Sequence, residues 1–129
     1  ATNLRDAAKP DADNPRPRRM PIDPEGPAAY WTRLPLRSIL KDFADHHIPA
    51  TLSSDAGTYV CNSLFYNLLN WAATKDHVIG GFLNFPTVNE QPHPQHGLPL
   101  AQQIAAARDV VHETVRHYLE PSSGEILLA

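Results

Sequence analysis

The sequence predicts an α/β fold of three layers, in which helices flank a central, mostly parallel β-sheet. Segments with the apolar spacing of helices alternate with short strand-like segments, and this alternation is typical of parallel sheets. Two or three strands make only a narrow sheet, and an all-parallel sheet needs helices packed on both of its faces. Three helices are few for that purpose. We therefore expect residues 1–129 to form a single partial domain that lacks its N-terminal elements.

The N-terminal segment, residues 1–27, is rich in proline and in charge. Such a segment cannot form a long helix and is a poor central strand, so we interpret it as an extended arm of the domain. A small basic cluster lies within it. Both a solvated loop and an arm that docks on a partner are compatible with this composition. The prolines are Pro10, Pro15, Pro17, Pro21, Pro24 and Pro27, and the basic residues are Arg16, Arg18 and Arg19.

The first helix is predicted to begin at Pro35, because proline suits the first helical position. Leu36, Ile39, Leu40 and Phe43 follow at helical spacing. We expect the helix to end near residues 46–47, where two histidines suit the negative end of the helix dipole. Residues 28–32 and 48–52 are short strand candidates on either side of this helix.

A second helix is predicted over residues 63–73, and Val78–Phe85 is a buried-strand candidate that is apolar on both faces. Pro99 opens the last helix, and Pro121 ends it. Each of these two helices has an apolar stripe. The stripe of the second helix is Val60, Leu64, Leu68 and Ala72, and that of the last helix is Leu100, Ile104, Ala107, Val111, Val115 and Leu119.

The composition narrows the classes of function. The formal net charge of −3 gives no broad basic field to hold a nucleic acid, so we expect no nucleic-acid partner. The longest nearly apolar run, residues 78–85, is too short to cross a bilayer, so we expect no membrane partner. One cysteine allows no internal disulfide, and with no apolar leader at the N-terminus the expected location is the cytoplasm.

Cys61 is the strongest candidate for chemistry. A turn that contains Gly57 leads into it, and a helical stretch follows it. A thiol at a helix N-terminus faces unpaired backbone N–H groups and the positive end of the helix dipole, and both favour the reactive thiolate. The sequence therefore indicates a nucleophile, although a small buried residue that packs like alanine is an equally open interpretation.

A base for this thiol is expected at the end of the next strand, because sites in parallel sheets form beyond the carboxyl ends of the strands. If the two strands are neighbours, residue 84 projects toward the Cys61 turn. That residue is Asn84, and a carboxamide cannot act as a general base near neutral pH. Asp55, His93 and His96 are the few groups that could replace one. The two histidines could also be a metal pair, but they lack a third ligand, so we expect no metal.

Four parts of the sequence resemble a known enzyme family. Ser54–Tyr66 closely resembles the nucleophile motif of the pyrrolidone carboxyl peptidases, also called pyroglutamyl peptidases of type I. Gly80–Pro86 is similar to the histidine motif of that family, with Glu90 and Gln91 following. Residues 21–35 match the preceding segment, and Ala1–Ala7 resembles the stretch just after the catalytic glutamate of the family.

The resemblance implies a cytosolic cysteine peptidase, often a homo-oligomer, that removes pyroglutamate from the N-terminus of peptides without a cofactor. By position, Cys61 is the nucleophile and its backbone N–H is one oxyanion donor. Ala8 aligns with an arginine whose backbone amide is another donor. Tyr59 and Val60 line the pocket for the lactam ring.

Two departures from the family pattern lead to a second hypothesis. Asn84 stands where the family has its catalytic histidine, and the segment with the catalytic acid is absent. The alternative to a peptidase is therefore an impaired or inactive homologue or fragment that acts in binding or assembly. An unrelated small binding module is the third possibility.

Overall fold

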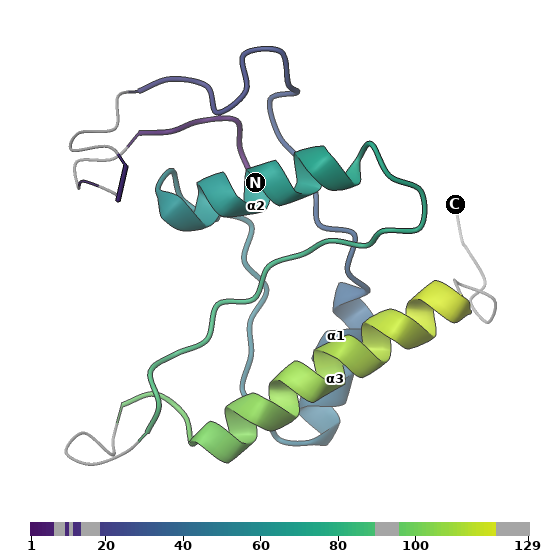
Figure 1. Ribbon diagram of the computed structural model, residues 1–129. Helices are drawn as coiled ribbons and strands as arrows, with labels where there is room; N and C mark the ends of the chain where they lie inside the picture. The colour runs from purple at the N-terminus through teal and green to yellow at the C-terminus, as the bar shows by residue number, and fades with distance from the viewer. Residues whose placement is uncertain (7–9, 11, 14–18, 90–95, 121–129) are drawn as a thin grey trace. The chain divides into compact units, whose positions relative to one another are not determined.

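The computed structural model describes all residues except 7–9, 11, 14–18, 90–95 and 121–129 (Figure 1). The chain forms two compact units. Unit 1 comprises Ala1–Leu34 and Ser53–Phe82, and unit 2 comprises Pro35–Leu52 and Leu83–Ala129. All three predicted helices are present: α1 is Leu36–Asp45, α2 is Val60–Ala72 and α3 is Leu100–Leu119.

The helix boundaries follow the signals that the sequence contains. Pro35 and Pro99 are the residues directly before α1 and α3. Their fixed φ angles, −75° and −57°, are close to helical values, and a proline at this place loses no intrahelical hydrogen bond. α1 ends at His46 and His47, and the positive φ of 56° at His47 turns the chain out of the helix.

In unit 1, α2 packs with a face that the apolar spacing does not predict. The buried residues are Asn62, Tyr66, Leu69 and Ala72. Of the predicted stripe only Ala72 is buried, while Val60 is 48% exposed and Leu64 is 61% exposed. The packed face is therefore partly polar, and its polar groups need hydrogen-bond partners from the rest of the unit.

Those partners come from the N-terminal segment, which folds back on itself beside α2. Isolated antiparallel bridges join Thr2 to Ala29 and Arg5 to Met20. The side chain of Asn3 spans the two limbs, since it accepts from the Asp23 N–H at 2.9 Å and donates to the Asp23 carbonyl at 2.7 Å. The described parts of residues 1–27 are thus tied to unit 1 by specific hydrogen bonds.

In unit 2, α1 packs against α3, and Figure 1 shows the two helices side by side. Ile39 and Phe43 of α1, Ile48 after it, and Ala106 and Val110 of α3 form the apolar core. The predicted apolar stripe of α3 lies mostly on the opposite face and is exposed; Val111, for example, is 63% exposed and Val115 is 51% exposed.

The described residues do not form the predicted sheet. Their only strand pairings are three isolated bridges. One joins Thr2 to Ala29 of the strand candidate 28–32, one joins Arg5 to Met20 within the N-terminal segment, and one joins Val88 to Leu98. The segments 28–32, 48–52 and 78–85 have strand-like sequences, but a strand forms only where a neighbouring backbone pairs with it over several residues. In 28–32 that pairing is limited to the contacts of Ala28, Ala29 and Tyr30 with residues 1–3. Within 78–85 the Gly80 carbonyl accepts one backbone hydrogen bond, from Arg33 at 3.2 Å, and no ladder extends from it among the described residues.

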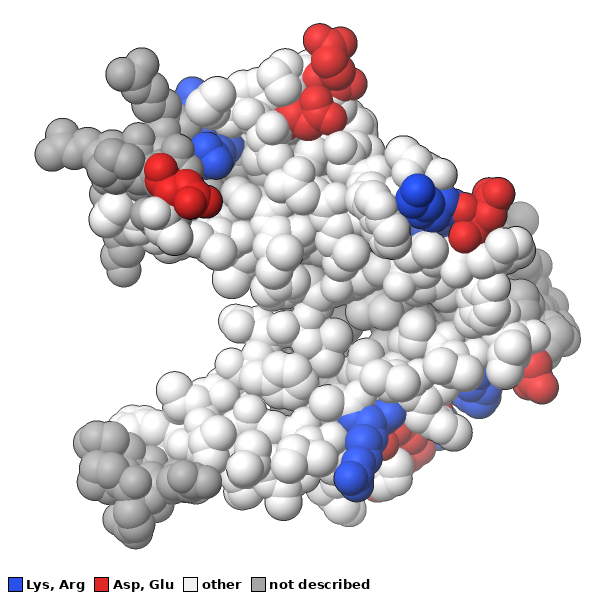
Figure 2. Space-filling model, in the orientation of Figure 1, with Lys and Arg blue, Asp and Glu red and all other residues white. Residues whose placement is uncertain are grey.

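The charged side chains are distributed in small groups. On the face that Figure 2 shows, Lys and Arg lie in small groups, and the described residues visible there form no broad basic patch. None of the described helices combines the length and the apolar character that crossing a membrane requires.

Candidate active site

Cys61 is the second residue of α2 and is exposed to solvent. The turn before it is held by short-range hydrogen bonds. Gly57 N–H donates to the Asp55 carboxylate at 2.7 Å, and the φ of Gly57 is +74°, a conformation that favours glycine. The exposure of Cys61 excludes the interpretation that it packs as a small buried residue.

The first backbone N–H groups of α2 lie next to Cys61 in the chain. The first hydrogen bond of α2 runs from Ser63 N–H to the Tyr59 carbonyl at 3.0 Å. The N–H groups before Ser63, including that of Cys61, therefore have no acceptor within the helix. Such a group next to a nucleophile can stabilise negative charge that develops on a carbonyl oxygen.

Residues on both sides of Cys61 bind the N-terminal segment. Asn62 contacts Thr2 and Leu4 through its side chain, at distances between 2.8 and 3.5 Å. Thr58 donates its hydroxyl to the Asp6 carbonyl at 2.5 Å, and Asp6 N–H returns a bond to the Thr58 carbonyl at 3.1 Å. Hydrogen bonds thus join the turn before the cysteine, and the first turn of α2, to residues 2–6.

The predicted substrate-binding residues lie next to the cysteine in the chain. Tyr59 is partly exposed and donates its hydroxyl to the Pro10 carbonyl, and Val60 is 48% exposed. Ala8, the second predicted oxyanion residue, lies outside the described residues.

Asn84 is exposed and belongs to unit 2, whereas Cys61 belongs to unit 1. The segment that leads to Asn84 belongs to unit 1 as far as Phe82. There the Phe82 ring packs on Phe65 of α2, with ring centres 5.6 Å apart. The cleft that we predict between Cys61 and Asn84 remains a prediction.

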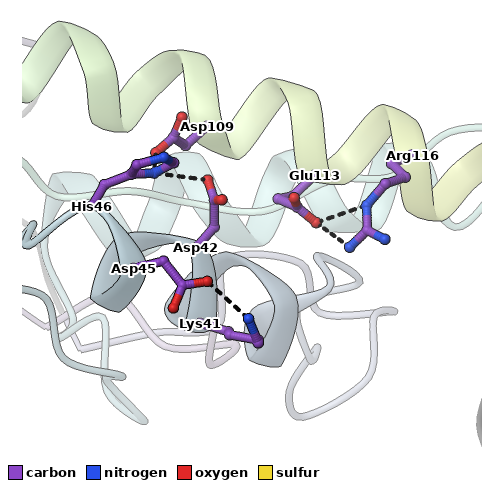
Figure 3. A network of polar contacts seen from close by, with 7 residues as sticks. All are labelled: Lys41, Asp42, Asp45, His46, Asp109, Glu113 and Arg116. Carbon is purple, nitrogen blue, oxygen red and sulfur yellow. Dashed lines mark hydrogen bonds and ion pairs between the residues drawn. The ribbon is translucent and has the colours of Figure 1, made fainter.

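A second polar cluster, which sequence analysis did not find, lies between α1 and α3. His46 Nδ1 lies 3.0 Å from the Asp109 carboxylate and 3.6 Å from that of Asp42 (Figure 3). Burial raises the pKa of Asp42, and a hydrogen bond with Asp109 raises it further, while His46 opposes the shift. The i, i+4 spacing of Asp42 and His46 could have indicated one pair, but Asp109 is far away in the sequence.

This cluster has residue types that can bind a metal, since ligand atoms of all three side chains lie within 4.8 Å of one another. The contacts account for the arrangement without an ion, because Asp42 shares a hydrogen bond with Asp109 and both side chains lie next to the His46 imidazole. A pocket of about 360 Å³ lies beside it, lined by His46, Ile48, Gln102, Ala105, Arg108 and Asp109. Of the histidine pair that the sequence suggested, His96 is exposed and His93 lies outside the described residues.

A solvent-exposed cysteine at the start of a helix, where the first N–H groups have no acceptor within the helix, is a setting in which reactive cysteines occur. The chain belongs to the pyroglutamyl peptidase family, whose model matches residues 1–117. The family members are peptidases with a cysteine nucleophile, which agrees with the resemblance around Cys61.

Individual relatives agree with this assignment. A pyrrolidone-carboxylate peptidase of Bacillus subtilis (strain 168) is 46% identical over 92 residues, which cover 70% of this chain and 43% of that protein. One of Bacillus licheniformis is 40% identical over 121 residues and covers 88% of this chain and 56% of its own length. The chain spans about half the length of these curated relatives.

The fold also has solved relatives. A crystal structure of pyroglutamyl peptidase I from Bacillus amyloliquefaciens matches with a TM-score of 0.82 at 36% identity, over 92% of this chain and 59% of that one. The pyrrolidone carboxyl peptidase of Thermococcus litoralis matches with a TM-score of 0.79 at 28% identity, over 100% of this chain and 62% of that one. The α/β class of these proteins is therefore the fold class of this chain, although its described residues form no sheet.

Proposed function

We propose that this chain carries the nucleophile of a cysteine omega-peptidase that removes pyroglutamate from the N-terminus of peptides. The observation that supports this best is the exposure of Cys61 at the start of α2, within the segment that is similar to the nucleophile motif of the family. We further propose that the protein acts in the cytoplasm as a homo-oligomer and needs no cofactor.

In the proposed reaction the Cys61 sulfur attacks the carbonyl carbon of the pyroglutamyl residue. The bond between that carbon and the peptide nitrogen breaks, the amine leaves with the proton that the thiol loses, and a thioester remains on the enzyme. Water then hydrolyses the thioester, which releases pyroglutamate and restores the thiol. The Cys61 N–H and that of Ala8 are the proposed oxyanion donors, and Tyr59 and Val60 are the proposed contacts of the lactam ring.

A specific observation supports a second candidate function. Asn84 occupies the position of the family's histidine, and it can neither accept the thiol proton nor donate one to the leaving amine. General acid–base assistance is typically worth about 10²–10⁴-fold in rate. The alternative is therefore a catalytically impaired member of the family that acts in binding or assembly.

The test uses a pyroglutamyl amide of a fluorogenic amine, with the purified chain and its Cys61→Ala variant as the matched control. Release of the amine above the Cys61→Ala control supports the peptidase. Release of no more than one equivalent of amine per chain, together with a Cys61 thioester visible in the intact mass, indicates a nucleophile without turnover. Absence of both excludes the peptidase function for this chain.

The role of Asn84 is tested in a chimera. In it, this chain is fused to the part of the Bacillus subtilis relative that lies outside the matched region. If the missing base limits turnover, Asn84→His raises kcat by about 10²–10⁴-fold, with Asn84→Ala as the control that leaves it low. Equal turnover in the chimera with Asn84 unchanged and in its Asn84→His variant would exclude the impaired-homologue hypothesis.

A further inference from the structure

Asn62, the residue directly after the candidate nucleophile, is completely buried, with 0% of its surface exposed. Its side-chain oxygen accepts from the Thr2 N–H at 2.9 Å and from the Thr2 hydroxyl at 3.5 Å. Its side-chain nitrogen donates to the Thr2 carbonyl at 2.8 Å and to the Leu4 carbonyl at 3.2 Å. A carboxamide can make four hydrogen bonds, so the whole capacity of Asn62 is directed at residues 2–4.

These bonds determine how the first turn of α2 is oriented. Successive residues of an α-helix lie about 100° apart around its axis. Because Asn62 is held against the N-terminal segment, Cys61 is rotated away from that segment, and the structure shows Cys61 exposed beside the buried Asn62. The bonds also hold the first turn in helical form, although no side chain caps it.

We propose that Asn62 is a positioning residue for Cys61. By joining the first turn of α2 to the backbone of Thr2 and Leu4, it holds that turn in place, so that Cys61 stays at the positive end of the helix dipole. The inference rests on the proposed function in one respect, the role of Cys61 as a nucleophile. The bonds of Asn62 themselves do not depend on what substrate the protein takes.

A second, partly buried amide on α2, Asn70, serves as the control that separates a positioning role of Asn62 from a merely structural one. Asn70 accepts from the Tyr30 hydroxyl at 2.6 Å and donates to the Asp23 carboxylate at 3.1 Å. Asn70 therefore also joins α2 to the N-terminal part of unit 1, but more than two turns from Cys61. Loss of Asn70 should loosen the packing of unit 1 without changing the first turn of α2.

The experiment measures the rate at which iodoacetamide alkylates Cys61 in the full chain, near pH 6 and near pH 9. The ratio of the two rates reports how well the helix start favours the thiolate, whereas general exposure changes both rates together. Asn62→Leu removes all four bonds at similar volume. Thr2→Pro removes the N–H and the hydroxyl from which Asn62 accepts, and Thr2→Ala is its matched control because it removes the hydroxyl but keeps that N–H.

We expect Asn62→Leu and Thr2→Pro to lower the ratio of the rate near pH 6 to that near pH 9 about three- to fivefold, the size expected for a charge at a helix terminus. Asn70→Ala and Thr2→Ala should leave it unchanged. Where Asn62→Leu does not fold, Thr2→Pro decides. An unchanged ratio in Thr2→Pro, or an equal fall in Asn70→Ala, would overturn the proposal.

This outcome is separate from that of the peptidase test. Iodoacetamide reacts with any accessible thiolate, so the ratio can fall as expected in a chain that never forms a pyroglutamyl thioester. Conversely, thioester formation that is insensitive to Asn62→Leu, with an unchanged alkylation ratio, would support the peptidase and reject Asn62 as its positioning residue.

Discussion

His46 joins α1 to α3 through Asp109, with 3.0 Å between the imidazole Nδ1 and the carboxylate oxygen (Figure 3). The Asp42 carboxylate lies 3.6 Å from the same nitrogen. Two carboxylates from two helices thus share one imidazole. The packing of α1 against α3 in unit 2 therefore includes a carboxyl group, Asp42, whose pKa is raised by burial and by its hydrogen bond with Asp109.

The stability of the protein should reflect the raised pKa of Asp42. Because the folded-state pKa lies above the ordinary value of 3.8, the folded state binds more protons than the unfolded state in the window just above 3.8. Asp42 therefore lowers the free energy of unfolding as pH rises through its folded-state pKa. We expect Asp42→Asn to become more stable relative to wild type over that rise, as measured by urea unfolding at several pH values.

Asp45→Asn is the matched control for this pH series. A hydrogen bond and the charge of Lys41 lower the pKa of Asp45. Asp45 therefore stabilises the folded state at pH values above its ordinary pKa of 3.8, and this stabilisation is lost as pH falls through its folded-state pKa. The two variants should differ in the sign of their pH dependence. The same sign in both would contradict the assignment of Asp42.

Tyr66 should be important for the stability of unit 1, because the residue is 0% exposed and its hydroxyl donates to the Pro27 carbonyl at 2.7 Å. Burial raises the pKa of Tyr66, with smaller contributions from Tyr30 and Asp23, so the hydroxyl stays protonated and able to donate. Tyr66→Phe leaves the carbonyl without this partner. We expect a loss of about 1–2 kcal/mol in the free energy of unfolding.

Denaturant unfolding measures this loss, and Asn67→Ala is the control because Asn67 is exposed on the same helix. The Asn67 side chain donates to the Ser63 carbonyl within the helix, at 2.8 Å. We expect that variant to stay within about 0.5 kcal/mol of wild type. Equal effects of the two variants would argue against the Tyr66–Pro27 bond.

Two glycines with positive φ should respond differently to alanine. Gly97 has φ +80°, and a Cβ added to it would collide with the Thr87 carbonyl group. Gly57 has φ +74°, and a Cβ there would meet no atom within 4 Å. Gly57→Ala should cost only the conformational strain, about 1–2 kcal/mol, and Gly97→Ala clearly more. The melting temperatures of the two variants test this difference, and equal melting temperatures would contradict it.

The two faces of α3 should differ in their contribution to stability. Val110 is 8% exposed and packs in the core of unit 2, while its neighbour Val111 is 63% exposed. We expect Val110→Ala to lower the free energy of unfolding by about 2 kcal/mol and Val111→Ala by less than about 0.5 kcal/mol. Urea unfolding of the two single variants is a direct comparison. A larger loss in Val111→Ala would show that its face is covered in solution.

The sequence by itself determined the elements that depend on local physics. Pro35 and Pro99 mark the starts of α1 and α3 because a proline ring presets φ and lacks an N–H. The Gly57 turn before Cys61 was also predictable, since a positive φ favours glycine. The family resemblance around Cys61, confirmed by the match over residues 1–117, depends on the same local motif.

Only the tertiary structure decided which groups meet. Apolar spacing on α2 pointed to Leu64, but Asn62 and Tyr66 form the buried face. Hydrogen bonds with the N-terminal segment offset the cost of burying those polar groups, and such partners lie far away in the sequence. The contact between His46 and Asp109 has the same origin, because a periodic pattern describes one helix and carries no information about the side chain opposite it.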